Sequence, residues 1–262
     1  MVINMVNVTI KRKEFLDFIS SFGDVEDLKI TFKYDKGNNA MMYATVAYIS
    51  HYLKKHKYIP PESIGKAGDL DISELKKVKQ FLKASKEDYL SIKQTGSGKT
   101  LHVTAGASKI TLPTSSTIVS YSKAPLFEKL VVKAWASNWT KFHDCDLTVH
   151  GDINLEDLAT VSKMRGILNS SPIFTINAHV GEGEFTISSG KRHEAKLFTT
   201  TPLVNASSDI SENVGVKSTF GAWLMDNLKL FNTGSATIHM GESTMIVFEK
   251  GEDVLVVVDQ RM

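Results

Sequence analysis

The residues best suited to chemistry cluster at 143–146, where the chain reads His143-Asp144-Cys145-Asp146. A histidine, a cysteine and two carboxylates are typical of metal sites and of nucleophilic catalysis. Adjacent residues on a strand point to opposite faces, however, so these four side chains cannot converge on one ion or one substrate. No H-E-x-x-H or G-x-S-x-G pattern occurs elsewhere in the chain. We therefore expect a structural or solvated role for this cluster, with no catalytic residue, no bound metal and no cofactor.

A second pattern imitates a phosphate-binding loop. The segment 95–100, with the sequence TGSGKT, ends like the motif G-x-x-x-x-G-K-[ST], but Lys93 stands where that motif needs its first glycine. A helix should follow such a loop, so that its N-terminal amides face the phosphates. The next residues, 101–104, instead alternate apolar and polar as a strand does. The sequence predicts a hairpin turn here and excludes a nucleoside triphosphatase of this type.

Basic residues gather on segments with helical periodicity. In 72–86, lysines recur at spacings of three and four, so they share one helical face beside an apolar stripe. A solvated face is the simpler interpretation of any one such stripe. All four predicted helices nevertheless carry positive charge away from their apolar sides. The basic residues concerned are Lys11, Arg12, Lys13, Lys76, Lys77, Lys79, Lys83, Lys86, Lys163, Arg165 and Lys229.

These side chains must be positioned by short helices and many strands. Amphipathic helices are predicted over 12–22, 72–86, 155–168 and 220–231. Their expected N-caps are Asp71 or Ser73 for the second helix, Asn154 for the third, and Ser218 or Thr219 for the fourth. Alternating or apolar runs predict strands over 6–10, 28–34, 89–93, 101–104, 109–112, 147–150, 174–180, 184–188, 236–240, 245–249 and 254–258.

The predicted elements repeat. Each half reads strand, helix, strands, helix and three closing strands, at a nearly constant offset. This pattern predicts an α+β protein built from two similar domains, with much antiparallel sheet and few helices. We place the first domain at 1–114, an inter-domain connector and entry to the second domain at 115–144, and the second domain at 145–262.

Composition agrees with a folded protein of moderate size. The chain has 262 residues, of which 42% are hydrophobic and 23% charged. A net charge of +2 excludes a simple polycation but not a local basic surface. No apolar run approaches the roughly 18 residues of a membrane span, and we see no secretory signal. The single cysteine, Cys145, is typical of a reducing compartment, so we expect the cytoplasm.

Four stretches together resemble a known family. They are 107–113, 154–166, 173–187 and 220–231 with the three strands that follow. In their order and spacing they resemble the sliding clamps of DNA polymerases, which are processivity factors, and within them the bacteriophage type that is similar to proliferating cell nuclear antigen. Two features depart from that pattern. The stretches 38–69 and 126–144 are longer than a minimal clamp needs, and the charge is less acidic than the family's.

The resemblance implies antiparallel sheets outside and two helices per domain inside, assembled into a closed homotrimeric ring around duplex DNA. It implies a non-enzymatic tether for a polymerase, in the cytoplasm of a phage's host. The basic helical residues would then contact phosphates without reading bases. A pocket for short peptides of the polymerase and clamp loader would be bordered by Leu126, Phe127, Leu130 and Val131 of the connector and by Val257 and Val258. Ordinary core packing is an equally good interpretation of each of these six residues.

Two other classes of function remain open on the sequence alone. One is a nonspecific nucleic-acid-binding or phage structural protein that forms no closed ring. The other is a small hydrolase whose site is not recognisable, although no convergent titratable groups support it.

Overall fold

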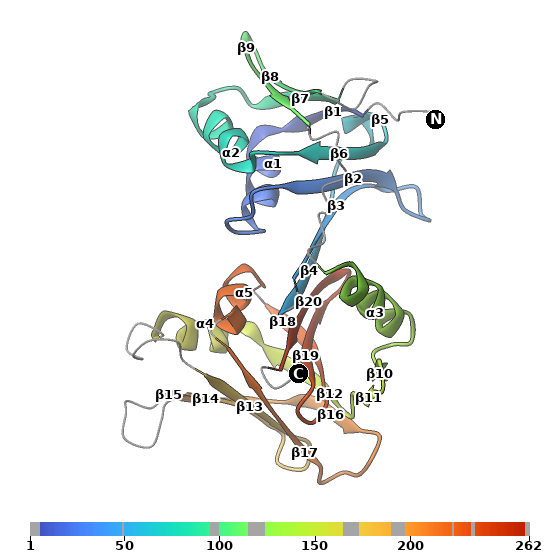
Figure 1. Ribbon diagram of the computed structural model, residues 1–262, viewed down its shortest axis with the longest axis vertical. Coiled ribbons are helices and arrows are strands. Elements are labelled where there is room, and N and C mark those ends of the chain that lie inside the picture. Colours follow the sequence, from blue (N-terminus) through green and yellow to red (C-terminus); the bar gives the residue numbers. More distant parts are fainter. Residues whose placement is uncertain are drawn as a thin grey trace. The chain divides into compact units, whose positions relative to one another are not determined.

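The structure is a computed structural model that describes residues 6–48, 50–94, 100–114, 124–164, 173–189, 197–221, 223–231 and 234–259. The chain divides into two compact units. One contains Met1–Val46 and Lys54–Ser122, and the other contains Ala47–Leu53 and Lys123–Met262. The chain thus enters the second unit from Ala47, the last residue of β3, to Leu53, the third residue of β4, and then returns to the first unit (Figure 1).

The first unit begins with a strand and a helix and ends with a helix and three strands. Its elements are β1 (Asn7–Lys11), α1 (Arg12–Ser20), β2 (Leu28–Tyr34), β3 (Ala40–Ala47), β4 (His51–Tyr58), the 3₁₀ turn η1 (Pro61–Ser63), β5 (Ile64–Lys66), β6 (Gly68–Ile72), α2 (Leu75–Ala84), β7 (Tyr89–Gln94), β8 (Thr100–Ala105) and β9 (Ser108–Pro113).

The second unit starts with three elements of its own and then follows the same order. The extra elements are α3 (Pro125–Ala136), β10 (Lys141–Phe142) and β11 (Cys145–Asp146). The others are β12 (Val149–Asn154), α4 (Leu155–Met164), β13 (Phe174–His179), β14 (Glu184–Ser189), β15 (Leu197–Pro202), β16 (Val204–Ser208), β17 (Gly215–Phe220), α5 (Trp223–Phe231), β18 (Ser235–Met240), β19 (Met245–Lys250) and β20 (Asp253–Val258).

Strand pairing repeats between the units as closely as element order does. The first unit has strands in the order β5-β1-β7-β8-β9, and the second has β16-β12-β18-β19-β20. A run of four strands is β4-β3-β2-β6 in the first unit and β15-β14-β13-β17 in the second, and β10 pairs with β11. The pairs whose registers are described are antiparallel. The expected duplicated α+β architecture, rich in antiparallel sheet and poor in helix, is therefore confirmed.

In each unit two helices contact each other, α1 with α2 and α4 with α5. Their apolar stripes are buried: Phe15, Phe18 and Ile19 on α1, and Leu75, Val78 and Leu82 on α2. Strands such as β8 and β13 alternate buried and half-exposed residues, because one face of each sheet meets the helices. The first helix of each unit begins with an equivalent backbone hydrogen bond. The amide of Arg12 donates to the carbonyl of Asp88, and the amide of Leu155 donates to that of Gly234.

Residues 38–69 correct one expectation. This stretch, which looks too long for a minimal clamp, forms β3, β4, η1, β5 and the first two residues of β6. It therefore supplies two strands of the four-stranded sheet and the edge strand β5, each with a counterpart in the second unit. In β4 the alternation of buried and exposed residues is lost after Leu53, since Lys54 to Lys57 are all partly exposed.

The segment 126–144 also differs from the expectation of an irregular connector. Its helix α3 begins with Pro125 at the first helical position, where the missing amide hydrogen costs nothing. Residues 127, 130, 131 and 134 follow the i, i+3, i+4, i+7 spacing of a buried helical face. Helix α3 belongs to the second unit, and it lies on the opposite face of β18, β19 and β20 from α4 and α5 (Figure 1).

The expected helix caps have mixed outcomes. The side chain of Asn154 accepts from the amide of Glu156 at 3.1 Å, as an N-cap does. Ser73 instead donates to the carbonyl of Pro113, and Glu74 occupies the N-cap of α2 with a left-handed φ of 58°. Ser218 and Thr219 lie within β17, so neither caps α5. The caps expected for the second and fourth helices are therefore wrong.

His51 makes the stability of the second unit dependent on pH. It lies on the segment Ala47–Leu53, with its Nδ1 3.0 Å from the hydroxyl of Ser50 and its ring 4.9 Å from that of Tyr48. Burial lowers the pKa of His51 to about 4, from an ordinary value of 6.5. In the unfolded chain His51 therefore binds a proton below pH 6.5, whereas in the folded chain it binds that proton only near pH 4.

We expect the stabilisation from neutral His51 to be complete above pH 6.5 and to be lost progressively as the pH falls toward 4. At pH 5 the loss is about 2 kcal/mol, or a fall of ~4–8 °C in melting temperature. Melting curves of the wild type and of His51→Gln between pH 7.5 and 4.5 measure this. The variant should show a flatter pH profile, and His143→Gln, at an exposed histidine, should keep the wild-type profile. An unchanged profile in His51→Gln contradicts the assignment.

Candidate nucleic-acid interface and connector surface

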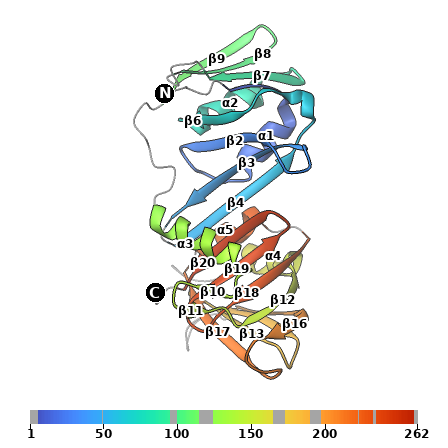
Figure 2. The same cartoon turned by 90° about the vertical axis from the view of Figure 1, so that its right-hand side faces the viewer.

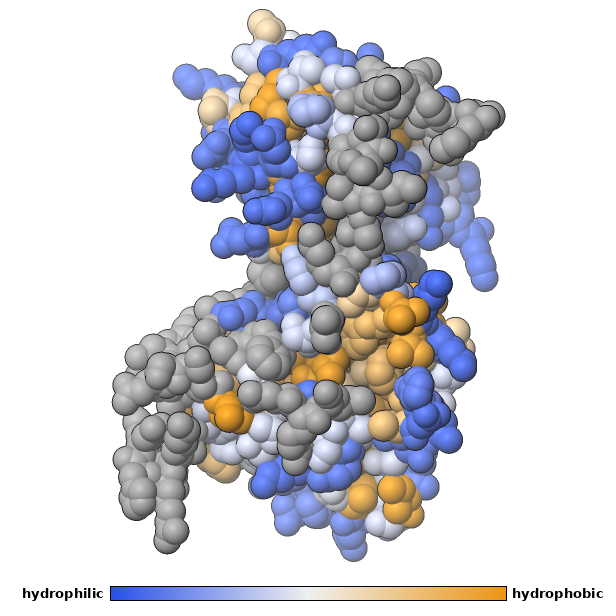
Figure 3. Space-filling model, in the orientation of Figure 1, coloured by the Kyte–Doolittle hydropathy of each residue, from blue (hydrophilic) through white to orange (hydrophobic). Residues whose placement is uncertain are grey.

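Helix α2 presents the strongest basic face among the described residues. Lys76, Lys77 and Lys83 are exposed, and hydrophilic residues cover the side of the first unit on which α1 and α2 lie (Figure 3). Lys77 forms an ion pair of 2.7 Å with Glu74, so part of its charge is compensated. Lys86 is exposed but lies beyond the end of the helix at Ala84.

Lys79 has a different role from its neighbours on α2. Its ammonium group donates to the carbonyl of Gly23 at 2.6 Å and is half-buried. Burial lowers the pKa of Lys79, and the charge of Lys83 lowers it further, while Asp24 opposes both. This lysine joins α2 to the loop after α1, whereas Lys76 and Lys83 are exposed.

At the start of α1 the three consecutive basic residues also separate by role. Arg12 donates from Nε to the carbonyl of Glu87 at 2.7 Å and from Nη1 to that of Leu82 at 3.1 Å. A guanidinium group there satisfies carbonyls at the end of α2 and complements the negative end of its dipole. Arg12 is thus a structural residue. Lys11 and Lys13 are exposed, with Lys11 lying 3.8 Å from Glu14.

The second unit does not show a matching basic face in the part of the chain that is described. Arg165 and the side chains of Lys163 and Lys229 lie outside that part. The charged side chains that are described on α4 and α5 are acidic: Glu156, Asp157 and Asp226. Asp157 is used structurally, as it accepts from the hydroxyl of Thr201 at 2.5 Å.

Helix α3 covers the outer face of the sheet in the second unit with an apolar contact. Val131 and Ala134 are buried among Met245, Val247, Val254 and Val256, and Phe127, Leu130 and Trp135 pack at the margin. Figure 2 shows α3 lying over β19 and β20. Hydrophobic residues also gather on the surface at α3 (Figure 3), where Leu126 is 75% exposed and Val132 is 51% exposed.

The six residues expected to border a peptide pocket therefore divide into three groups. Leu126 is on the surface, and Phe127, Leu130 and Val258 are half-buried. Val131 and Val257 are fully buried and are core residues. Val257 also lies on the wrong face of β20, because Val254 and Val256 are the residues that meet α3 and side chains alternate along a strand.

A polar network missed by the sequence reasoning fixes α3 and the turn after it to the sheet. The carboxylate of Glu249 on β19 accepts from the indole N–H groups of Trp135 and Trp139, each at 3.0 Å. It also contacts Nε2 of His239 at 3.2 Å. The hydrogen bond from His239 is the main cause that lowers the pKa of Glu249, and the indoles contribute, while burial opposes them.

Two histidines extend this network along paired positions of β12 and β18. The Nδ1 atoms of His150 and His239 lie 2.9 Å apart, so they share a single hydrogen. Because Glu249 can only accept, His239 carries a proton on Nε2, and its Nδ1 accepts from His150 when both rings are neutral. Burial, and then the nearby His239, lowers the pKa of His150.

The clusters singled out as possible catalytic or metal groups do not form such sites among the described residues. His143 lies 2.8 Å from Asp144, with both side chains largely exposed. No group of three or more potential metal ligands occurs in the described ranges. Residues 95–99 lie outside them, but a strand, β8, follows and pairs antiparallel with β7, as a hairpin requires. No described helix is both long and apolar enough to cross a membrane.

No family model and no curated protein sequence matches the chain, whereas solved structures do. A DNA polymerase sliding clamp from Caulobacter crescentus aligns with 98% of this chain at a TM-score of 0.67 and 10% identity. This chain spans 66% of that protein's length. The PCNA2–PCNA3 complex of Sulfolobus tokodaii contains a chain that is matched over 100% of its length, covering 98% of this one, with a TM-score of 0.64 and 11% identity.

A third match is A. fulgidus PCNA, which was solved with the C-terminal region of FEN-1. The alignment covers 97% of this chain and 97% of the PCNA chain, with a TM-score of 0.61 and 13% identity. Bacterial and archaeal clamps of different lengths therefore share the arrangement of strands and helices described above. The fold of this chain is that of the DNA polymerase sliding clamps, in a form with two of the repeated units.

We expect Glu249→Ala to lower the free energy of unfolding by about 2–4 kcal/mol, because two indole N–H groups and His239 lose their acceptor. Glu249→Gln keeps one acceptor oxygen and should cost less. Urea unfolding followed by tryptophan emission measures both. Glu212→Ala, at an exposed glutamate, is the matched control. Equal stability of the Glu249→Ala and Glu212→Ala variants contradicts a role for this network in holding α3.

Proposed function

We propose that this chain is the subunit of a ring-shaped sliding clamp, which encircles duplex DNA and tethers a DNA polymerase for processive replication. In this proposal the protein is not an enzyme. The observation that carries it is the repetition, within one chain, of a complete unit with the sliding-clamp fold. The similarity to archaeal clamps of the same length supports a clamp of two units per chain.

In this proposal the ring closes through strands at the sheet edges. In the second unit the amide of Val258 on β20 donates to the carbonyl of Ser50, so the edge of β20 is covered by the segment that leads into β4. The counterparts of β20 and β4 are β9 and β15, and both are outermost strands. Pairing β9 of one subunit with β15 of the next would make a head-to-tail interface that closes by rotation. Three such subunits give a homotrimer of six units.

DNA contact in this proposal comes from the exposed lysines of the first unit's helices. Lys13, Lys76, Lys77 and Lys83 would meet phosphates, which carry no sequence information and therefore suit a protein that slides. Lys79 and Arg12 support these helices by their bonds to backbone carbonyls.

Partner binding is assigned to the surface of α3. Leu126 and Val132, with the half-buried Phe127 and Leu130 beside them, offer an apolar surface for a short peptide of a polymerase or clamp loader. The PCNA solved with the C-terminal region of FEN-1 supports this kind of partner. We further propose a bacteriophage origin and a role in the cytoplasm of the host.

Topological binding gives a direct test. The protein should co-elute with nicked circular plasmid at subunit concentrations where rings open and close, and it should be released when the plasmid is linearised. Lys76→Glu with Lys83→Glu should reduce retention on the circle about tenfold or more and lower its salt dependence, because about two phosphate contacts are lost.

The matched control is Leu126→Ser, which changes an exposed residue on α3 and should leave retention on the circle unchanged. Retention that survives linearisation would mean that the protein binds nucleic acid without a closed ring. Wild-type retention by the lysine variant would mean that the α2 face does not contact DNA.

A further inference from the structure

The outer face of the sheet β4-β3-β2-β6 carries a second group of basic and aromatic residues, on the first unit alone. On β2 and β3 the inward residues such as Ile30, Phe32 and Met42 are buried, whereas Lys33 and Tyr43 face outward. Lys54, His56 and Tyr58 lie on one side of β4 because side chains alternate. We call Lys33, Tyr43, Lys54, His56 and Tyr58 the sheet platform.

Ring contacts show that these side chains converge. The ammonium groups of Lys33 and Lys54 lie 4.7 Å and 5.9 Å from the ring centroid of Tyr43. The rings of His56 and Tyr58 meet edge to face at 5.4 Å. Two cations drawn to one ring repel each other, so the arrangement favours an anion that bridges them.

Acidic residues lie at the margins of the sheet platform. Asp69 on β6 is bound by Lys29 at 2.6 Å and by the hydroxyl of Thr31 at 2.7 Å. Burial lowers the pKa of Lys29. The hydrogen bond with Asp69 is the main cause that raises it, Asp71 on the same strand contributes, and the net shift is upward. Asp69 is therefore engaged by Lys29 and Thr31 of β2, whereas Lys33 and Lys54 converge on Tyr43 of β3.

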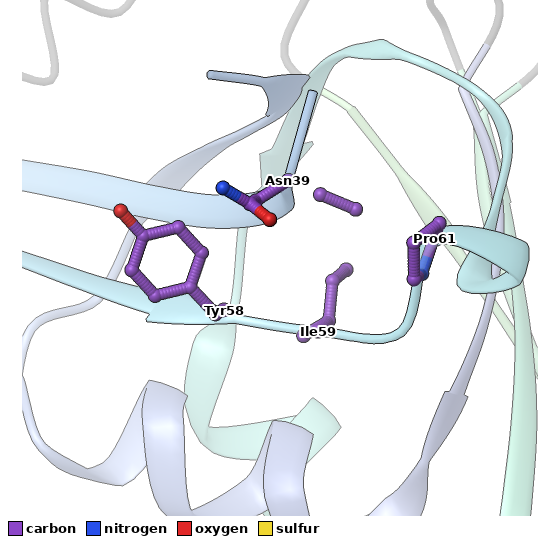
Figure 4. A pocket seen from close by; sticks show the side chains of 5 residues that line it. Asn39, Tyr58, Ile59 and Pro61 are labelled. Carbon is purple, nitrogen blue, oxygen red and sulfur yellow. The ribbon is translucent and has the colours of Figure 1, made fainter. Parts of the chain in front are cut away.

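A pocket opens at the end of the sheet platform. It has a volume of about 340 Å³, at the lower end of the range for small-ligand sites, and is lined by Asn39, Ala40, Tyr58, Ile59 and Pro61 (Figure 4). Asn39 donates its amide N–H₂ to Asp35, and the hydroxyl of Tyr58 also bonds to Asp35. These bonds orient an aromatic ring and an amide beside apolar walls, which is the chemistry that holds a nucleobase.

We propose that the sheet platform binds single-stranded nucleic acid, with phosphates at Lys33 and Lys54 and a base against Tyr58 in the pocket. Tyr58 lies four positions after Lys54 on β4, or ~13 Å along the strand. An acidic peptide would use the lysines but not the aromatic pocket. This surface is distinct from the α2 face and does not rest on ring formation.

Fluorescence anisotropy of the full chain with a labelled 20-nucleotide oligo(dT) tests the proposal. Lys33→Gln with Lys54→Gln should weaken binding about tenfold or more and lower the salt slope by ~1.4, because each phosphate contact to a single strand contributes ~0.7. Tyr58→Leu should weaken binding about tenfold by loss of stacking and leave the salt slope unchanged.

The matched control is Lys129→Gln with Lys133→Gln, which removes the same charge from exposed lysines of α3 in the second unit and should leave oligo(dT) affinity unchanged. Circular dichroism melting checks that every variant folds. Wild-type affinity in the Lys33/Lys54 variant overturns the proposal, as does an equal loss in the control. Competition by polyglutamate as effective as that by unlabelled oligo(dT) overturns it too, because charge alone would then explain binding. Since a linear oligonucleotide needs no ring, a failed plasmid test leaves this result interpretable.

Discussion

Unpaired backbone at the edges of sheets is the constraint on which this structure depends. Each unit contains one run of five hydrogen-bonded strands and one run of four, and the outermost strand of a sheet has N–H and C=O groups that need partners. In the second unit the edge of β20 is covered by the segment 47–53 of the same chain. The equivalent strand of the first unit is β9, which ends at Pro113. The outermost strand β15 ends at Pro202, and its Phe198 is 68% exposed. The proposed ring would give β9 and β15 a partner at once.

The connector adds specificity to this duplicated scaffold. A short apolar helix on a sheet could slide, because hydrophobic contact has no direction. Glu249 fixes its position, since one carboxylate is bound by Trp135, Trp139 and His239 from three elements of the second unit. This leaves the opposite side of α3, with Leu126 and Val132, available at the surface. A partially buried charge is thus used to orient the helix that carries the proposed partner surface.

Much of the architecture could be predicted from the sequence, because strong periodicity survives in it. The strand at 28–34 and the duplicated order of helices and strands follow from alternation alone. The strand β4 was missed because Lys54 to Lys57 interrupt that alternation. For the site, the lysines of α2 were predicted, but the structural use of Lys79 and Arg12 depends on carbonyls of Gly23 and Leu82, which no local pattern reveals. Likewise Glu249 meets its tryptophans only across more than 100 residues of sequence.

The native mass of the full chain in solution tests the central claim most directly. A ring of three subunits has three times the chain mass of 29.0 kDa. Native mass spectrometry or light scattering over a series from below one micromolar to tens of micromolar should show this species growing with concentration, because assembly follows mass action. A mass of one chain or of two chains at every concentration would contradict ring closure through β9 and β15.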